Sequence, residues 1–179
     1  MFDRPQEEHL LSARRFEVRR VTRSLPDGRL QSREVVRHPG SVVIVPCVDA
    51  DYVCLIRNFR LSVHETLIEL PAGTLESSEP PRECASRELI EETGYRAASM
   101  RELTDFFAAP GILDEKMHLF LAEQLSGGDP EREPEEEIEN LVVTWREAFA
   151  MVRSGEIHDA KTIVGLFVGW HTLQGSWPG

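Results

Sequence analysis

The distribution of apolar and polar residues along the chain predicts a fold that mixes strands and helices. Residues 41–49 read SVVIVPCVD, and such a continuous apolar run rich in β-branched residues is typical of a fully buried strand. In residues 160–173 the apolar side chains recur at intervals of three and four, which is the spacing of an amphipathic helix. Similar patterns predict further strands over residues 52–60, 101–108, 116–123 and 141–145, and a helix over residues 146–154.

The N-terminal region has a pattern of its own. Residues 15–23 and 29–37 are two strand-like segments separated by Pro26-Asp27-Gly28, a tripeptide that favours a tight turn. We therefore expect an antiparallel β-hairpin. His38-Pro39-Gly40 then interrupts the pattern before the buried run begins. These signals divide the chain into an N-terminal β-hairpin region, residues 1–40, and one catalytic domain, residues 41–175.

Composition and charge restrict the class of protein. At 179 residues with 41% hydrophobic residues, the chain has the usual size of one domain and can bury a core of its own. Its net charge of −11 argues against nucleic acid or an anionic membrane as the main partner, because both attract basic surfaces. The N-terminus lacks the features of a signal peptide, and no window has the apolar length of a membrane span. We expect a cytoplasmic enzyme.

Cysteine and histidine residues give no indication of a zinc site. Cys47, Cys54 and Cys84 are odd in number and have no CxxC spacing, so we expect reduced structural thiols. The six His residues are scattered without the spacing of metal ligands.

Residues 73–95, GTLESSEPPRECASRELIEETGY, carry the strongest chemical indication in the chain. Glu91 and Glu92 fall three and four positions after Glu88, so in a helix the three carboxylates share one face. Such crowded negative charge requires a cation, and hard carboxylate oxygens predict Mg²⁺, with Mn²⁺ as an alternative ion. Because Mg²⁺ is commonly shared with substrate phosphates, we expect a phosphate-bearing substrate. A solvated acidic helix paired with nearby arginines is the alternative, but it leaves the preceding glycine loop unexplained.

The same stretch resembles the signature of the Nudix hydrolases, a glycine loop followed by an Arg-Glu…Glu-Glu helix and a closing glycine. The positions in register are Gly73, Glu79, Arg87, Glu88, Leu89, Glu91, Glu92, Gly94 and Tyr95. Tyr95 is aromatic where the family more often has an aliphatic residue, but the position requires only bulk. The resemblance implies a Nudix fold of the α/β (α+β) class, with a mixed β-sheet sandwiched between helices and the N-terminal antiparallel β-hairpin added to it.

Sequence outside this stretch resembles one branch of the family, the ADP-ribose pyrophosphatases, over most of residues 33–165. The resemblance implies Mg²⁺-dependent hydrolysis of ADP-ribose, a nucleoside diphosphate sugar, to AMP and ribose 5-phosphate. Other nucleoside diphosphate derivatives stay open as substrates: ADP-glucose, GDP-mannose, NADH and dinucleoside polyphosphates. A non-catalytic nucleotide-sugar-binding module is less favoured, because the acids of the signature are intact. The branch also implies a homodimer to which residues 1–40 contribute.

The resemblance assigns roles around the metal. The Ala72 carbonyl and the carboxylates of Glu88 and Glu92 are the implied main ligands, and Glu91 ligates or supports them. Arg87 is implied to orient the glutamates. Glu79 either holds the loop geometry or interacts with the helix N-terminus as a dipole partner.

Further positions are implied to contact substrate or to take a proton. Arg60, after Asn58 and Phe59, matches a basic residue that contacts phosphates, although a surface salt bridge is the alternative. The other implied substrate-binding positions are Phe59, Pro110, Gly111 and Glu115, and for Glu115 a role in the subunit contact alone is the alternative. A loop glutamate ahead of the last strand serves as catalytic base or metal ligand in this branch. The candidates within the acidic run 133–139, in order of preference, are Glu136, Glu137 and Glu135, and a solvated loop is the alternative.

Overall fold

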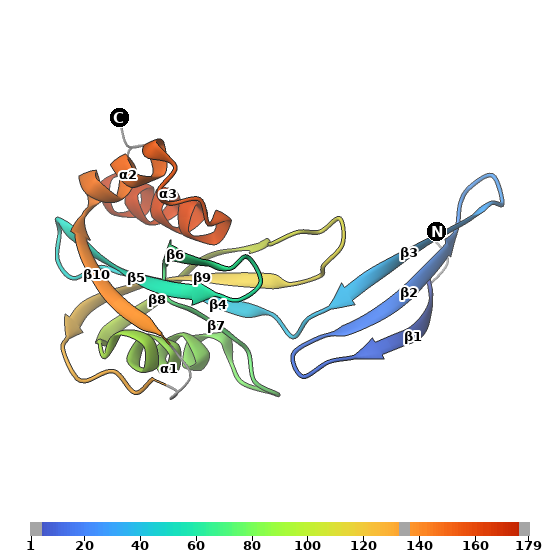
Figure 1. Ribbon diagram of the computed structural model, residues 1–179, viewed down its shortest axis with the longest axis horizontal. Coiled ribbons are helices and arrows are strands. Elements are labelled where there is room, and N and C mark those ends of the chain that lie inside the picture. The colour runs from blue at the N-terminus through green and yellow to red at the C-terminus, as the bar shows by residue number, and fades with distance from the viewer. Residues whose placement is uncertain (1–4, 133–136, 176–179) are drawn as a thin grey trace.

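The computed structural model describes residues 5–132 and 137–175 of the chain (Figure 1). The strands are β1 (Gln6–Ser12), β2 (Glu17–Ser24), β3 (Leu30–Arg37), β4 (Ser41–Pro46), β5 (Tyr52–Arg60), β6 (Glu65–Glu69), β7 (Ala72–Thr74), β8 (Arg96–Phe107), β9 (Lys116–Ser126) and β10 (Ile138–Thr144). The helices are α1 (Pro81–Thr93), α2 (Trp145–Ser154) and α3 (Ala160–Gln174).

The body of the molecule is built from two sheets. One is mixed, with strand order β7-β4-β9-β8, and its central pair β4–β9 is parallel while the outer pairs are antiparallel. The other is antiparallel, with strand order β10-β5-β6. The predicted mixed sheet is thus confirmed, and the sequence pattern did not separate the second sheet from it.

Strand β4 explains how helices come to cover both sides of the mixed sheet. All of its residues are buried, and successive side chains of a strand point to opposite faces. Val42 and Ile44 pack against α1, whereas Val43 and Val45 face the second sheet and the C-terminal helices. Figure 1 shows α1 on one side of the strands and α2 with α3 on the other. The continuous apolar run in the sequence is the signature of this two-sided burial.

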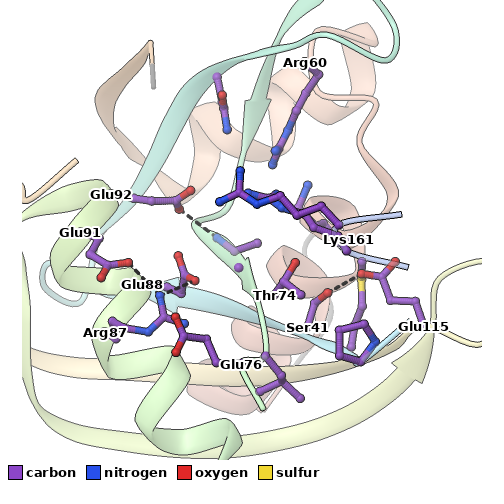
Figure 2. Close-up of a pocket in the computed structure, with 18 of the residues that line it drawn as sticks. Ser41, Arg60, Thr74, Glu76, Arg87, Glu88, Glu91, Glu92, Glu115 and Lys161 are labelled. Atoms are coloured by element: carbon purple, nitrogen blue, oxygen red, sulfur yellow. Dashed lines mark hydrogen bonds and ion pairs between the residues drawn. The ribbon is translucent and has the colours of Figure 1, made fainter. Parts of the chain in front are cut away.

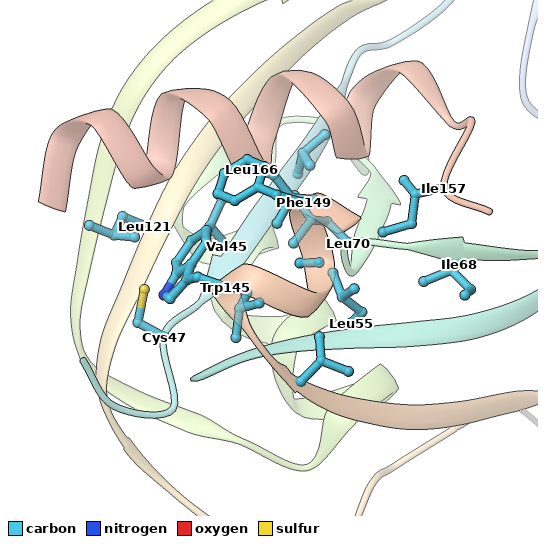
Figure 3. Packing of buried hydrophobic residues seen from close by; sticks show 14 of the residues in the cluster. Val45, Cys47, Leu55, Ile68, Leu70, Leu121, Trp145, Phe149, Ile157 and Leu166 are labelled. Carbon is cyan, nitrogen blue, oxygen red and sulfur yellow. The ribbon is translucent and has the colours of Figure 1, made fainter. Parts of the chain in front are cut away.

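The larger core lies between the two sheets and the C-terminal helices (Figure 3). Trp145 stacks on Phe149 with ring centroids 6.2 Å apart, and Phe149 meets Trp170 edge to face at 5.8 Å. Gly165 allows α3 to lie close to the sheet, because a Cβ atom there would stand 2.3 Å from Leu70 Cδ1. This contact places the N-terminal end of α3 beside the segment that leads into β7.

Strands β1, β2 and β3 form a separate antiparallel sheet that extends away from the body (Figure 1). The β2–β3 hairpin is the predicted one, with Gly28 in the left-handed region at φ 82°. Strand β1 was not predicted, since every one of its residues is exposed and its polar sequence QEEHLLS has no buried face. The boundary predicted at residue 40 stays a prediction.

Other features of the fold bear on the remaining sequence-based expectations. Cys47, Cys54 and Cys84 are free and buried. Strand β8 begins at Arg96, five residues before the predicted start, because it pairs with the whole length of β9. In the part of the chain that the structure describes, no helix is long and apolar enough to cross a membrane.

Candidate active site

A cavity of about 560 Å³ opens at the point where α1, β7 and the N-terminal end of α3 meet (Figure 2). Its walls carry charged groups of both signs. The acidic groups are Glu76, Glu88, Glu91, Glu92, Glu115 and Glu131, and the basic groups are Arg14, Arg15, Arg60, Arg87 and Lys161. This separation of charge over a small space suits a ligand that carries phosphate groups together with cations.

Helix α1 supplies the acidic wall. Pro80 is its N-cap and Pro81 occupies the first turn, where the missing N–H group costs nothing. The helix ends at Gly94 in the left-handed conformation, whose N–H donates to the carbonyl of Ile90. Between these ends, Cys84, Ala85 and Leu89 face the core, so the opposite face of the helix turns its glutamates to the cavity.

Arg87 connects three carboxylates of this wall. Its guanidinium donates to both oxygens of Glu79, at 2.9 and 3.0 Å. Its Nη1 group donates to Glu88 and to Glu91, both at 2.8 Å. Hydrogen bonding to Glu79, ahead of all other causes, raises the pKa of Arg87, so the guanidinium stays charged. The arrangement suits the orienting role that the resemblance implies, and it also shows that the glutamates do pair with an arginine of their own helix.

Glu79 fixes the loop that precedes α1. Its second partner is the backbone N–H of Glu76, which donates to Oε2 at 3.0 Å. The hydrogen bonds from Arg87 lower the pKa of the Glu79 carboxyl to about 2. Of the two roles proposed from sequence, these contacts favour the one that holds the loop geometry.

Strand β7 approaches α1 so closely that the side chains of the helix lie against its backbone. A Cβ atom at Gly73 would stand 1.9 Å from the carboxyl group of Glu88, so a side chain there would occupy the space of the carboxylate. The next contact along is a hydrogen bond of 3.0 Å from the N–H of Ala72 to Oε2 of Glu92. Glu92 is almost fully buried, at 4% exposure. These contacts bring the two implied main carboxylate ligands to the strand that carries the implied carbonyl ligand.

The donor set of this wall fits a hard divalent cation. Glu88, Glu91 and Glu92 offer carboxylate oxygens on one helix face, and the carboxylate of Glu88 lies against the backbone of Gly73. Among residues 5–132 and 137–175, no group of three or more His, Cys, Asp or Glu side chains stands ready in a metal-binding arrangement. The carboxylates of Glu88 and Glu91 are held in ion pairs with Arg87.

On the basic wall of the cavity, Arg60 and Lys161 bind the same buried carboxylate. Glu69, at 1% exposure, accepts two hydrogen bonds from Nε of Arg60 and one from Nη2, and it accepts another of 3.0 Å from Lys161. Lys161 also donates to Asp159 at 3.0 Å, and Asp159 is the N-cap of α3. Hydrogen bonding to Glu69 raises the pKa of Arg60. Arg60 thus forms a salt bridge, but with a buried carboxylate and not at the surface, and it also lines the cavity.

Glu115 lines the cavity on the side opposite the glutamates of α1 (Figure 2). It accepts a short hydrogen bond from the hydroxyl of Ser41, the first residue of β4. His38 Nδ1 lies 3.6 Å from the same carboxylate. The segment between the N-terminal sheet and the body is therefore tied to the loop that precedes β9.

Several predicted positions lie elsewhere. Within the described part of the chain, Phe59, Pro110, Gly111 and Glu137 are exposed and are not among the residues that line the cavity. Glu135 and Glu136 lie outside the described residues. In the order of the sequence, Glu137 directly precedes β10.

Three basic residues of the cavity were missed by sequence reasoning. Arg14 and Arg15 come from the turn between β1 and β2, and Lys161 comes from the first turn of α3. A pair of adjacent arginines before a strand was visible in the sequence, but only the fold brings it to the signature helix. Lys161 carried no local signal.

Comparison with known proteins gives concordant results. A family model described as the NUDIX domain matches residues 37–164. An ADP-ribose pyrophosphatase of Bacillus subtilis (strain 168) is 42% identical over 140 residues, which cover 77% of this chain and 76% of that protein. A methanol dehydrogenase activator of Bacillus methanolicus is 33% identical over 161 residues, covering 89% of this chain and 87% of the relative.

Two further similarities concern substrate and fold. A GDP-mannose pyrophosphatase of Salmonella typhi is 33% identical over 177 residues, covering 88% of this chain and 89% of the relative. A solved structure titled crystal structure of ADP compounds hydrolase superposes with a TM-score of 0.84 at 23% identity, over 98% of this chain and 97% of that one. The last similarity confirms the predicted fold.

Proposed function

Because the chain belongs to the NUDIX family, we propose that it is a hydrolase that cleaves the diphosphate of ADP-ribose, giving AMP and ribose 5-phosphate. The observation that carries the proposal is one cavity in which Glu88, Glu91 and Glu92 face Arg60 and Lys161. The first group suits divalent cations and the second suits phosphate oxygens. The name of the relative at 42% identity supports ADP-ribose as the substrate.

Mg²⁺ is the proposed cofactor, with Mn²⁺ as an alternative. Glu88, Glu91 and Glu92 would hold it together with the carbonyl of Ala72, on the strand that contacts two of them. A divalent cation bound there would neutralise phosphate oxygens and lower the pKa of an attacking water. Arg87, which binds Glu88 and Glu91, would keep those side chains oriented when the cation is bound.

The other groups of the chain bind the substrate and move a proton. Arg60 and Lys161 would donate to the phosphate oxygens, and the carboxylate of Glu69 would hold the guanidinium of Arg60 and the ammonium of Lys161 in place. A carboxylate of the run Glu135–Glu137 would accept the proton of the attacking water, with Glu136 as first candidate. The oxygen of that water bonds to phosphorus as the anhydride P–O bond breaks, and the second phosphate leaves with its sugar or nucleoside.

GDP-mannose is the second candidate substrate, because a GDP-mannose pyrophosphatase is 33% identical over 88% of this chain. The test is to incubate the protein with Mg²⁺ and ADP-ribose, ADP-glucose, GDP-mannose, NADH or a dinucleoside polyphosphate, and to quantify the phosphomonoesters released. We expect the highest kcat/KM for ADP-ribose. Preference for another member of the panel would refute the substrate, and turnover of none of them would refute the function.

A homodimer is also part of the proposal. The three-stranded sheet has exposed strand edges and the exposed apolar side chains of Leu10, Leu11 and Leu30, and the turn between β1 and β2 adds Phe16. Residues 5–37 contain eight Arg and five Asp or Glu, whereas the whole chain has a net charge of −11. A basic sheet of one copy therefore complements the acidic body of another.

Light scattering after size-exclusion chromatography tests the dimer. We expect a mass of twice the 20.3 kDa of one chain. Leu11→Glu would place a charge on an apolar side chain of the sheet that is 51% exposed, and we expect it to shift the mass toward that of one chain. A monomeric wild type at micromolar concentration would refute this part of the proposal.

A further inference from the structure

The C-terminal end of α1 is held by residues from a distant part of the chain. The last carbonyl groups of a helix have no partner within the helix. In α1 the carbonyl of Ile90 accepts from Gly94, the closing residue. The next three carbonyls, those of Glu91, Glu92 and Thr93, all accept from donors between residues 131 and 140.

These hydrogen bonds have good geometry. The N–H of Glu131 donates to the carbonyl of Glu91 at 3.1 Å. Arg132 directs two groups at the carbonyl of Glu92, with Nε at 3.0 Å and Nη2 at 2.9 Å. The side-chain amide of Asn140 donates to the carbonyl of Thr93 at 2.8 Å. A guanidinium at a helix C-terminus is also favoured by the helix dipole.

Arg132 and Asn140 act as one unit. Nη2 of Arg132 donates to Oδ1 of Asn140 at 2.7 Å, so the two side chains that hold the helix end also hold each other. Asn140 itself is fixed in β10, where it pairs with Ile56 of β5. The helix end is thereby attached to the second sheet, which carries Arg60 of the basic wall.

The connection between β9 and β10 also packs closely against the C-terminal end of α1. A Cβ atom at Gly94 would stand 2.3 Å from the carbonyl oxygen of Gly128. Two glycines therefore meet where the connection between β9 and β10 passes the helix end. Close approach and satisfied carbonyls together leave little freedom to the last turn of α1.

Glu92 is the residue on which these contacts converge. Its carbonyl receives both donors of Arg132, and its carboxylate receives the N–H of Ala72 at 3.0 Å. The residue is thus fixed through its backbone on one side and through its side chain on the other. In the sequence, Arg132 and Asn140 flank residues 133–139, which contain the acidic run.

We propose that Arg132 and Asn140 are positioning residues for the reaction, which hold the last turn of α1 and so fix the carboxylates of Glu91 and Glu92 for metal binding. The inference rests on the proposed function. It assigns to Arg132, in the connection between β9 and β10, and to Asn140, in β10, a role distinct from that of the glutamates between them. A group that orients a ligand without touching the metal commonly changes metal affinity or activity by about ten- to a hundredfold when it is altered.

Two variants and a matched control test the proposal. Arg132→Lys keeps the charge but loses the paired donors to one carbonyl. Asn140→Asp keeps the acceptor for Arg132 and loses the donor to Thr93. The control is Arg96→Lys, because Arg96 binds the same connection through the exposed carboxylate of Glu131, at 2.9 Å, without touching the helix end.

Three quantities are measured for each protein: the Kd of Mn²⁺ by calorimetry without substrate, kcat and KM for ADP-ribose, and Tm. For Arg132→Lys and Asn140→Asp we expect the Kd of Mn²⁺ to rise about tenfold and kcat to fall about tenfold, with KM nearly unchanged. The control should match the wild type in all three. The KM should hold because neither residue touches the basic wall.

The outcomes separate this inference from the function it rests on. Unchanged Mn²⁺ affinity and kcat in both variants, with a lower Tm alone, would mean that the contact only stabilises the fold, and would overturn the proposal. Variants in which kcat stays constant and only KM rises, so that kcat/KM falls by the same factor, would overturn it as well. A wild-type protein that binds Mn²⁺ but leaves ADP-ribose intact would refute the proposed substrate, while the Mn²⁺ affinities would still test the positioning role.

Discussion

Replacing Gly73 by alanine should separate catalysis from stability. The added Cβ atom would meet the carboxyl carbon and one oxygen of Glu88 at 1.9 Å, whereas ordinary contact begins at 3.4 Å. The carboxylate must therefore move by about 1.5 Å, the difference of the two distances. Because it is the far end of a flexible side chain, it can move without disturbing the backbone.

We expect kcat to fall about a hundredfold, since a displacement of about 1 Å in an active site commonly has that effect. The free energy of unfolding should change by less than about 1 kcal/mol, because alanine restricts the unfolded chain at a residue outside the left-handed region, while the displaced carboxylate loses its ion pair with Arg87. Initial rates with ADP-ribose and urea unfolding measure the two quantities.

Gly127→Ala is the matched control. No atom of the described residues lies within 4 Å of a Cβ placed at Gly127, and its φ is not positive, so both quantities should equal those of the wild type within error. A Gly73→Ala protein that keeps wild-type kcat would show that the carboxylate of Glu88 is not needed where it lies. A large loss of stability would instead show that the strand, and not the side chain, gives way.

Three other predictions concern the charged groups. Glu92→Gln should remove most activity while the Tm changes little, and a variant with normal turnover would contradict its role as metal ligand. The hydrogen bonds from Arg87 lower the pKa of Glu79 from 4.5 to about 2, so this pair stabilises the fold fully above pH 4.5 and loses its effect as the pH falls toward 2. In Arg87→Met, urea unfolding between pH 5 and 3 should show a weaker dependence on pH; an unchanged slope would exclude the pair as its source. Glu69→Gln should lower the free energy of unfolding by about 3 kcal/mol, because the charged groups of Arg60 and Lys161 lose their shared buried carboxylate. If urea unfolding shows a loss below about 1 kcal/mol, water replaces the carboxylate as the partner of these groups.

Local signals in the sequence predicted the acidic wall well. The prolines and Gly94 that bound α1 act within one turn of chain, and the three glutamates share a face through helical periodicity alone. The buried run at β4 was equally plain, because both of its faces are covered. Such features depend on neighbours in the sequence, which is why they could be read without the fold.

The basic wall and the N-terminal sheet depend on contacts between distant segments. Glu69 pairs with Ile56 in the register of β5 and β6, so Arg60, which pairs with Glu65, reaches it only through its long side chain. Glu69 meets Lys161 across 92 residues of chain. No periodicity encodes such contacts. Strand β1 was not predicted for a related reason: all of its residues are exposed, so its sequence lacks the alternation of apolar and polar residues that indicates a strand.

The acidic run shows a third kind of limit. A sequence of successive glutamates offers no apolar marker that would set its register, so the choice among Glu135, Glu136 and Glu137 rested on family resemblance alone. The neighbours Arg132 and Asn140 carried no motif, yet they make the specific contacts with α1.

The burial of all three cysteines has a practical consequence for labelling. Desolvation raises the pKa of the Cys47 and Cys54 thiols to about 12, and burial also raises the pKa of Cys84. All three should stay protonated at neutral pH and react slowly with maleimides. A cysteine introduced at Leu30, which is 72% exposed, would then take a spin label selectively, without prior removal of any native thiol. If the proposed homodimer forms, the distance between two such labels would report how the two copies of the sheet face each other.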